Sequence, residues 1–109
     1  MERLFSCAGF DDGSGELCII GMPFESNASL FRGAKHGSRL IRESSLSLET
    51  YLPDLKKDIS GMRFSDMGDV KAVPRLGKRK YIFLGGDHSI TIKSFSGMYR
   101  PGLKYICLD

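Results

Sequence analysis

The fold of this chain is decided by the apolar run Tyr81-Ile82-Phe83-Leu84, which is followed directly by Gly85-Gly86-Asp87-His88-Ser89. Four consecutive apolar residues closed by two glycines predict a buried strand that ends in a sharp turn. A short helix over 89–96, with Ser89 as its N-cap, is predicted next. Residues 103–108 form a second apolar run and predict another strand. This order of strand, helix and strand is typical of a parallel α/β sheet that is covered on both faces.

The same alternation of strands and helices is predicted in the N-terminal part of the chain. Residues 17–20 are an apolar run that predicts a buried strand, and residues 63–66 predict a short one. Between them, helical spacing predicts a helix over 38–51, with Ser38 as its N-cap and Pro53 ending it. The predicted buried stripe of this helix consists of Leu40, Ile41, Ser45, Leu48, Tyr51 and Leu52. Its charged residues fall on the other faces: Arg39, Arg42, Glu43 and Glu49. Residues 56–58 are predicted to be a solvated link.

Composition places the chain among globular proteins and excludes several functional classes. Apolar residues make up 41% of the 109 residues, which is too many for a disordered chain. No apolar run reaches the roughly 18 residues of a membrane-spanning helix. The net charge of +3 is too small to indicate nucleic acid, so we expect neither a nucleic-acid nor a membrane partner. We expect Cys7, Cys18 and Cys107 to be free thiols in a reducing, cytoplasmic setting, with Cys18 and Cys107 buried.

The predicted parallel sheet is small and leaves one edge open and poorly covered. Such a sheet is typical of a piece of a larger domain rather than of a complete one. We therefore expect residues 1–109 to form the N-terminal part of a single α/β domain, incomplete in itself.

Ligands bind outside the carboxyl ends of the strands in a parallel sheet, so the residues directly after each strand are the candidates for function. His88 follows the strongest strand, where an imidazole can meet a metal or a substrate, and Asp87 could orient a neighbouring group. The alternative is a turn in which Asp87 is a capping residue and His88 is solvated. If the last two strands are neighbours, Asp109 faces the same crevice as His88; otherwise Asp109 is simply solvated.

Three further groups are weaker candidates. Asp66 and Asp69 flank Gly68, a pattern that permits metal ligation but favours an Asx-type turn. His36 lies in a loop flanked by glycines and is interpreted as a surface or capping residue. The basic cluster over 75–80 lacks interleaved aromatic residues, which favours a solvated loop over an anion site.

Five stretches of the sequence, in this order, resemble motifs of the ureohydrolase family, which includes agmatinase and arginase. They are residues 20–25 (IGMPFE), 33–43 (GAKHGSRLIRE), 66–70 (DMGDV), 85–91 (GGDHSIT) and 105–109 (YICLD). The GGDHS stretch is the most specific of them. Residues 41–51 look more like agmatinases than arginases.

The resemblance implies a three-layer, parallel-sheet, arginase-like α/β fold with a binuclear manganese (Mn²⁺) centre at the strand ends. His88 would be a metal ligand, and Asp109 would be the carboxylate that bridges both ions. Two divalent cations lower the pKa of a shared water, and the resulting hydroxide attacks a guanidinium carbon. The implied reaction is the hydrolysis of agmatine to putrescine and urea, in polyamine biosynthesis. The implied enzyme is a cytoplasmic homo-oligomer that acts on a small guanidino substrate.

The sequence departs from the family pattern at several points. It ends at Asp109, the first residue of the second metal motif, so only two of the family's ligands are present. Arg32 and Ser38 stand where agmatinases usually have proline, and the link between Val70 and Tyr81 is short. We therefore expect the isolated 109-residue chain to be inactive. The alternatives are an arginase or another guanidino hydrolase, a short non-catalytic paralogue that assembles with a partner, and a small α/β domain in which GGDH is only a turn.

Overall fold

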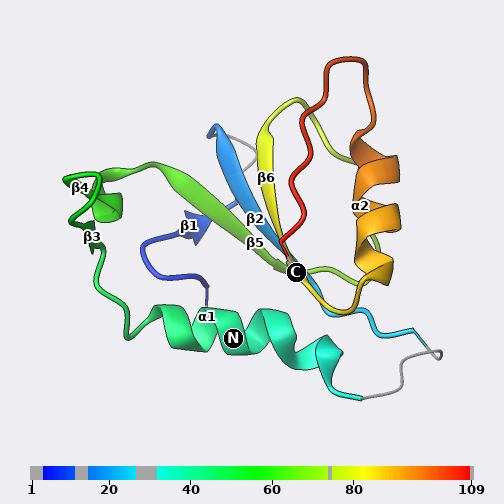
Figure 1. Ribbon diagram of the computed structural model, residues 1–109, viewed down its shortest axis with the longest axis horizontal. Coiled ribbons are helices and arrows are strands. Elements are labelled where there is room, and N and C mark those ends of the chain that lie inside the picture. The colour runs from blue at the N-terminus through cyan, green and yellow to red at the C-terminus, as the bar shows by residue number, and fades with distance from the viewer. Residues whose placement is uncertain (1–3, 12–14, 27–31, 74, 109) are drawn as a thin grey trace.

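The computed structural model describes residues 4–11, 15–26, 32–73 and 75–108. These residues contain a four-stranded parallel sheet in the order β1-β5-β2-β6, flanked by two helices (Figure 1). The strands of the sheet are β1 (Gly9–Phe10), β2 (Leu17–Met22), β5 (Phe64–Asp69) and β6 (Lys80–Gly85). The helices are α1 (Gly37–Ser45) and α2 (Ser89–Met98), with short 3-10 turns at η1 (Ala34–His36) and η2 (Ile59–Gly61). A separate antiparallel hairpin pairs β3 (Tyr51–Leu52) with β4 (Lys57–Asp58).

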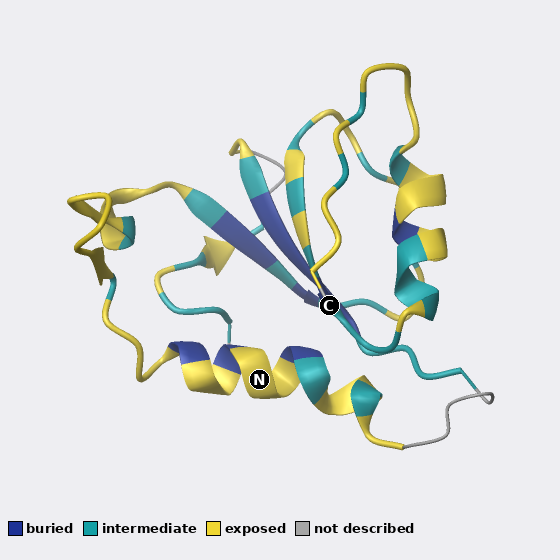
Figure 2. Ribbon diagram, in the orientation of Figure 1, coloured by how far each residue is buried: buried dark blue, intermediate teal, exposed yellow. Residues whose placement is uncertain are grey.

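Strand β2 is the most buried strand of the sheet (Figure 2). It pairs in parallel with β6 along one side and with β5 along the other. Cys18, Ile20 and Met22 are fully buried and pack with side chains of β6 and α2. Ile19, on the opposite face, is buried on the side of α1. The predicted three-layer α/β fold with a parallel sheet is therefore confirmed for this part of the domain.

The predicted strands over 17–20, 63–66 and 81–84 are confirmed as β2, β5 and β6, each longer than predicted. The predicted burial of 81–84 is wrong, because β6 lies at the edge of the described sheet and Ile82 is 45% exposed. The helix predicted over 89–96 is confirmed as α2, although its N-cap is His88 rather than Ser89. Among the described residues, neither helix is long and apolar enough to cross a membrane.

Helix α1 buries a polar face rather than the predicted apolar stripe. Ser38, Arg42 and Ser45 are buried, whereas Leu40 and Ile41 remain 51% and 43% exposed. Only Ser45 of the predicted stripe is buried, and its apolar members are exposed, because α1 is anchored through an ion pair between Arg42 and acidic side chains of β5. Burying that charge orients the helix so that its leucine and isoleucine side chains face outward.

Helix α1 also ends earlier than predicted, at Ser45 rather than at residue 51. The Ser45 hydroxyl donates a hydrogen bond of 2.6 Å to the carbonyl oxygen of Arg42. Such side-chain bonds compete with the helical ladder and favour the end of a helix. The predicted N-cap is wrong as well, because His36 occupies the N-cap position of α1, without a capping hydrogen bond from its side chain, and Ser38 lies inside the first turn.

Residues 51–58 form the β3–β4 hairpin, where the sequence predicts the end of a helix and a solvated link. The turn between the strands places Lys56 at a positive φ of 51°. Asp58 then accepts hydrogen bonds from the hydroxyl and the backbone N–H of Ser60, at 2.7 and 2.9 Å. These bonds lower the pKa of Asp58. Both strands of the hairpin are exposed, including Tyr51 and Leu52, which the sequence predicts to be buried.

The strand predicted over 103–108 is wrong, because the structure has no strand in that segment. The segment packs on α2 instead. The hydroxyl of Tyr105 lies 2.7 Å from the Ser94 Oγ, and its ring meets that of Phe95 edge-on. An apolar run becomes a strand only when a neighbouring strand pairs with its backbone, and this run contacts the helix instead. Ile106 is accordingly 84% exposed.

The three cysteines are free thiols, as predicted, but only one of them is buried. Burial raises the pKa of the Cys18 thiol in the core. Cys107 is exposed, contrary to the prediction, because the segment that carries it is not part of the sheet. Cys7 is exposed as well.

Candidate active-site edge

The carboxyl ends of β2, β5 and β6 meet at one edge of the sheet. Because the strands are parallel, Met22 of β2 lies opposite Gly85 of β6, and Gly21 lies opposite Asp69 of β5. The segments that leave these strands therefore start side by side (Figure 1). This is the edge at which parallel α/β proteins bind their ligands.

The GGDHS turn joins β6 to α2 at this edge. A Cβ atom added to Gly86 would lie 2.7 Å from the carbonyl oxygen of Met22 and closer still to that of Phe24. The close approach of two backbones therefore requires glycine at this position. His88 follows as the N-cap residue of α2, and its side chain is exposed.

Asp87 caps the start of α2 and also binds the loop after β2. Its Oδ1 accepts hydrogen bonds from the Ser89 backbone N–H, at 2.9 Å, and from the Ser89 hydroxyl. Its Oδ2 accepts from the backbone N–H of Ser26 at 2.6 Å. The geometry matches the alternative of a turn with a capping aspartate and an exposed His88. That turn nevertheless places the imidazole at the ligand-binding edge, so the role of His88 as a metal ligand stays a prediction.

The second predicted ligand, Asp109, lies outside the described residues, and its position beside His88 stays a prediction. Among the residues that the structure describes, no three His, Cys, Asp or Glu side chains come together as a metal site. The nearby acids Asp66 and Asp69 are bound to Arg42. The described residues thus supply one imidazole at this edge and do not by themselves fit a two-metal centre.

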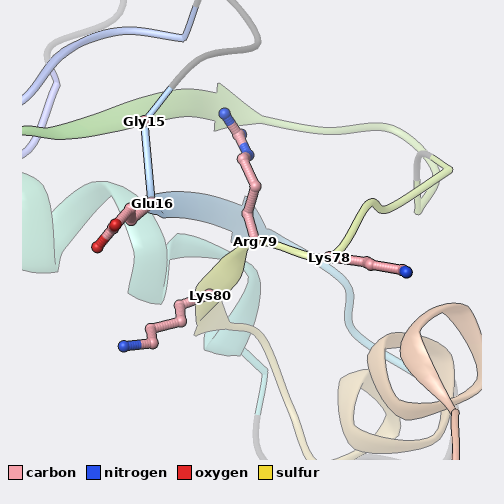
Figure 3. A pocket seen from close by; sticks show the side chains of 5 residues that line it. All are labelled: Gly15, Glu16, Lys78, Arg79 and Lys80. Atoms are coloured by element: carbon pink, nitrogen blue, oxygen red, sulfur yellow. The ribbon is translucent and has the colours of Figure 1, made fainter.

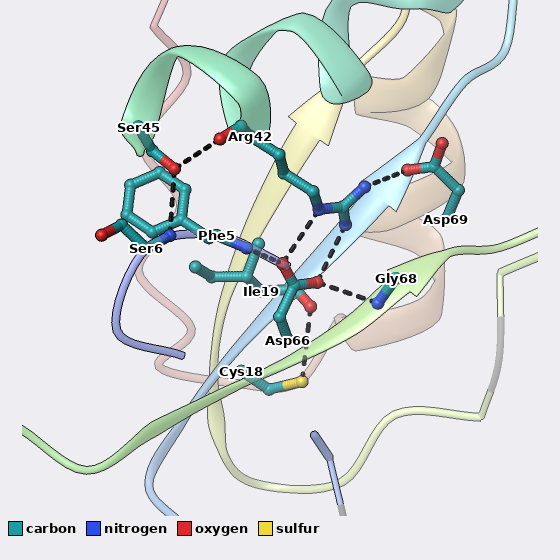
Figure 4. A network of polar contacts seen from close by, with 9 residues as sticks. All are labelled: Phe5, Ser6, Cys18, Ile19, Arg42, Ser45, Asp66, Gly68 and Asp69. Carbon is teal, nitrogen blue, oxygen red and sulfur yellow. Dashed lines mark hydrogen bonds and ion pairs between the residues drawn. The ribbon is translucent and has the colours of Figure 1, made fainter. Parts of the chain in front are cut away.

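A buried ion-pair network centred on Arg42 lies under this edge (Figure 4). The Nε and Nη2 atoms of Arg42 donate to the two carboxylate oxygens of Asp66, each at 2.9 Å, and Nη1 pairs with Asp69. Burial by itself would lower the pKa of Arg42, but hydrogen bonds with Asp66 and Asp69 outweigh it, so the pKa is raised. The guanidinium group is therefore charged at all ordinary pH values and ties α1 to the end of β5.

The Asp66 carboxylate also accepts hydrogen bonds from the backbone. It accepts hydrogen bonds from the N–H groups of Phe5 and Gly68, both at 2.8 Å. The bond to Gly68 is the Asx-type contact that the sequence predicts. The burial of Arg42 is the feature that the sequence prediction missed. A signal was present, because Arg42 shares its helix face with two small serines that leave room for a long side chain.

A second carboxylate missed by the sequence prediction organises the loop after β2. Glu25 accepts hydrogen bonds from the backbone N–H groups of Gly33, at 2.5 Å, and Ala34, at 2.9 Å. The bond from Gly33 is the main cause of the lowered pKa of Glu25. These bonds contribute fully to the free energy of unfolding at neutral pH, and their contribution is lost as the pH falls through the lowered pKa of Glu25. The nearby His36 is an exposed N-cap residue, which agrees with its interpretation as a surface or capping histidine.

The basic cluster over 75–80 lies at the opposite end of the sheet from His88, where β6 begins. Arg79 forms an ion pair of 2.9 Å with Asp11 and lies over the ring of Tyr81. An open pocket at this end is lined by Gly15, Glu16, Lys78, Arg79 and Lys80 (Figure 3). Most of the cluster is exposed, as a solvated loop should be. The glutamate within the pocket and the pairing of Arg79 both reduce its attraction for anions.

Comparisons with known proteins relate this arrangement to one family. Residues 15–78 match the model of the Arginase family. An agmatinase of Pyrococcus horikoshii is 34% identical over 99 residues, which cover 74% of this chain and 35% of the relative. An N(1)-aminopropylagmatine ureohydrolase of Thermococcus kodakarensis is 32% identical, covering 84% of this chain and 38% of the relative. The solved structure of proclavaminate amidino hydrolase from Streptomyces clavuligerus superposes with a TM-score of 0.67 at 21% identity, over 87% of this chain and 38% of that one.

The parallel sheet with its polar turns gathered at the strand ends is of the α/β class, whose members bind ligands at that edge. The chain belongs to the Arginase family, because the family model matches more than half of it. The resemblance to ureohydrolases and the arginase-like fold are therefore confirmed. The chain spans between 35% and 38% of the length of the relatives described above. The GGDHS turn lies beyond the residues matched by the family model.

Proposed function

We propose that residues 1–109 are the N-terminal part of a single ureohydrolase domain, and that the polypeptide containing them hydrolyses a guanidino C–N bond. The proposed reaction converts agmatine and water to putrescine and urea. The observation that supports this proposal most directly is the sequence similarity to an agmatinase at 34% identity, over three quarters of this chain. The substrate would be a small guanidino compound.

In the proposed site, His88 and Asp109 are metal ligands, and the metal is a pair of Mn²⁺ ions. Imidazole and carboxylate donors suit Mn²⁺, and His88 stands at the edge where parallel sheets bind ligands. When bound, a divalent pair supplies hydroxide near neutral pH. The remaining ligands must come from residues outside the described part of this chain. We expect the isolated 109-residue chain to be inactive for that reason.

We further propose that the enzyme is a cytoplasmic homo-oligomer in polyamine biosynthesis, with no nucleic-acid or membrane partner. Free thiols at exposed positions fit a reducing compartment. The net charge of +3 offers little attraction to nucleic acid or to an anionic membrane.

Urea release by the full-length polypeptide that contains these residues tests the proposed reaction. Agmatine, N(1)-aminopropylagmatine and arginine are supplied separately with Mn²⁺, and kcat/KM is measured for each. We expect agmatine to have the highest kcat/KM. A higher value for either other substrate would overturn the choice of agmatine, and no urea from any of the three would overturn the ureohydrolase proposal itself.

A further inference from the structure

Two loops at the strand-end edge are joined by several independent contacts. One loop follows β2 and comprises residues 23–26, and the other is the GGDHS turn over 85–89. The backbone of Gly86 packs against the carbonyl group of Phe24 in the first loop and against that of Met22, the last residue of β2. The N–H of Asp87 donates to the carbonyl oxygen of Phe24 at 3.0 Å. The ammonium group of Lys93 on α2 lies 4.5 Å from the centre of the Phe24 ring.

The Asp87 carboxylate completes this junction and needs both of its oxygens to do so. Oδ1 is used at the start of α2, by the N–H and the hydroxyl of Ser89. Oδ2 is used across the junction, by the N–H of Ser26 at 2.6 Å. An amide in this position would have to point its NH₂ group at one of these donors. The junction therefore selects a carboxylate rather than any polar side chain of the same shape.

We propose that Asp87 is a positioning residue, which holds the loop after β2 and the backbone of His88 in a fixed relation by binding both sides of the junction. This inference rests on the proposed function, because it takes His88 to be a metal ligand at the strand-end edge. Asp87 precedes His88 directly, so anchoring its carboxylate at two points fixes the backbone from which the imidazole projects. An error of about 1 Å in the placement of a reacting group can cost as much as a hundredfold in rate.

The test compares Asp87→Asn with Ser89→Ala in the full-length polypeptide. Asparagine preserves the shape of the side chain but loses one acceptor, whereas Ser89→Ala removes a donor without touching the bond to Ser26. We expect the Ser26 amide to exchange its hydrogen about tenfold faster in Asp87→Asn. We also expect kcat for urea release to fall by about tenfold or more, with a smaller change in KM. Ser89→Ala, which keeps the Ser89 N–H and the bond to Ser26, should change both measurements less than Asp87→Asn does.

Hydrogen exchange tests the hydrogen bond between Ser26 and Asp87 independently of activity. Unchanged exchange at Ser26 in Asp87→Asn would overturn the proposal, and so would faster exchange with unchanged kcat. A wild-type polypeptide that releases no urea would refute the proposed function instead, and with it the catalytic consequence of this contact. If Asp87→Asn does not fold, Asp87→Ser replaces it, because a serine hydroxyl can still cap α2 but is too short to reach Ser26. The same results are expected of that variant.

Discussion

Replacing Arg42 by methionine is expected to lower the free energy of unfolding by about 3–5 kcal/mol. Methionine keeps much of the length of the side chain but removes its charge and its donors. The Asp66 carboxylate, which is 1% exposed, would then be left buried without its cationic partner. Breaking one side of a buried ion pair is costly because the remaining charge cannot be solvated. Equilibrium unfolding in urea measures the loss.

Arg39→Met is the matched control for this substitution. Arg39 lies on the same helix and forms an ion pair of 3.3 Å with Glu43, but both side chains are about half exposed. Exposed pairs of this kind contribute about 0–1 kcal/mol. If Arg42→Met cost no more than Arg39→Met, the buried network would not be what holds α1 on the sheet.

Replacing Gly86 by alanine is the second substitution with a large expected effect. The added Cβ would lie 2.7 Å from the Met22 carbonyl oxygen and closer to that of Phe24, and backbone atoms cannot move aside as a flexible side chain can. We expect a loss of about 1–3 kcal/mol in the free energy of unfolding, as for an overpacked core. Thermal unfolding followed by circular dichroism measures it.

Gly61→Ala serves as the control for the change of glycine to alanine. A Cβ atom at Gly61 meets nothing within 4 Å. Its effect should stay within about 0.5 kcal/mol of zero, as for most surface substitutions. Equal losses from Gly86→Ala and Gly61→Ala would contradict the close approach of the GGDHS turn to the loop after β2.

The sheet was predictable where the signal was local. The apolar run at β2 is buried between β5 and β6, so its hydrophobicity reports its position directly, whereas the run at β6 lies at the edge of the described sheet and only its Leu84 is buried. The run over 103–108 is as apolar, but the sequence cannot say whether a partner strand pairs with its backbone. In this structure it packs on α2 through Tyr105. A strand depends on its neighbour in a way that an apolar pattern does not record.

The hydrophobic pattern of helix α1 predicts the wrong orientation, because the acids that anchor the helix are distant in the chain. Arg42 pairs with acids that are 24 and 27 residues further along. A hydrophobic pattern assigns an arginine to the exposed face, and only the ion pair with β5 reverses that assignment. The leucine and isoleucine side chains of α1 are exposed as a consequence.

The candidate site was predictable in its location more than in its details. Glycines directly after a strand indicated a turn at the ligand-binding edge, and the structure places the GGDHS turn there. The double use of the Asp87 carboxylate was not predictable, because its partner Ser26 lies 61 residues earlier in the chain. The same holds for Glu25, whose donors Gly33 and Ala34 lie eight and nine residues further along the chain.

Titration of Mn²⁺ into the full-length polypeptide tests whether His88 marks the metal-binding edge of a ureohydrolase domain. Wild type, His88→Ala and His36→Ala are compared by calorimetry, the last being the chain's other histidine, exposed at the start of α1. Loss of a residue that merely supports a ligand weakens metal binding by about 10–100-fold, so loss of a ligand should do at least as much. We predict that His88→Ala weakens Mn²⁺ binding to that extent and that His36→Ala leaves it unchanged. Equal Mn²⁺ affinity in wild type and His88→Ala would show that His88 is not a metal ligand.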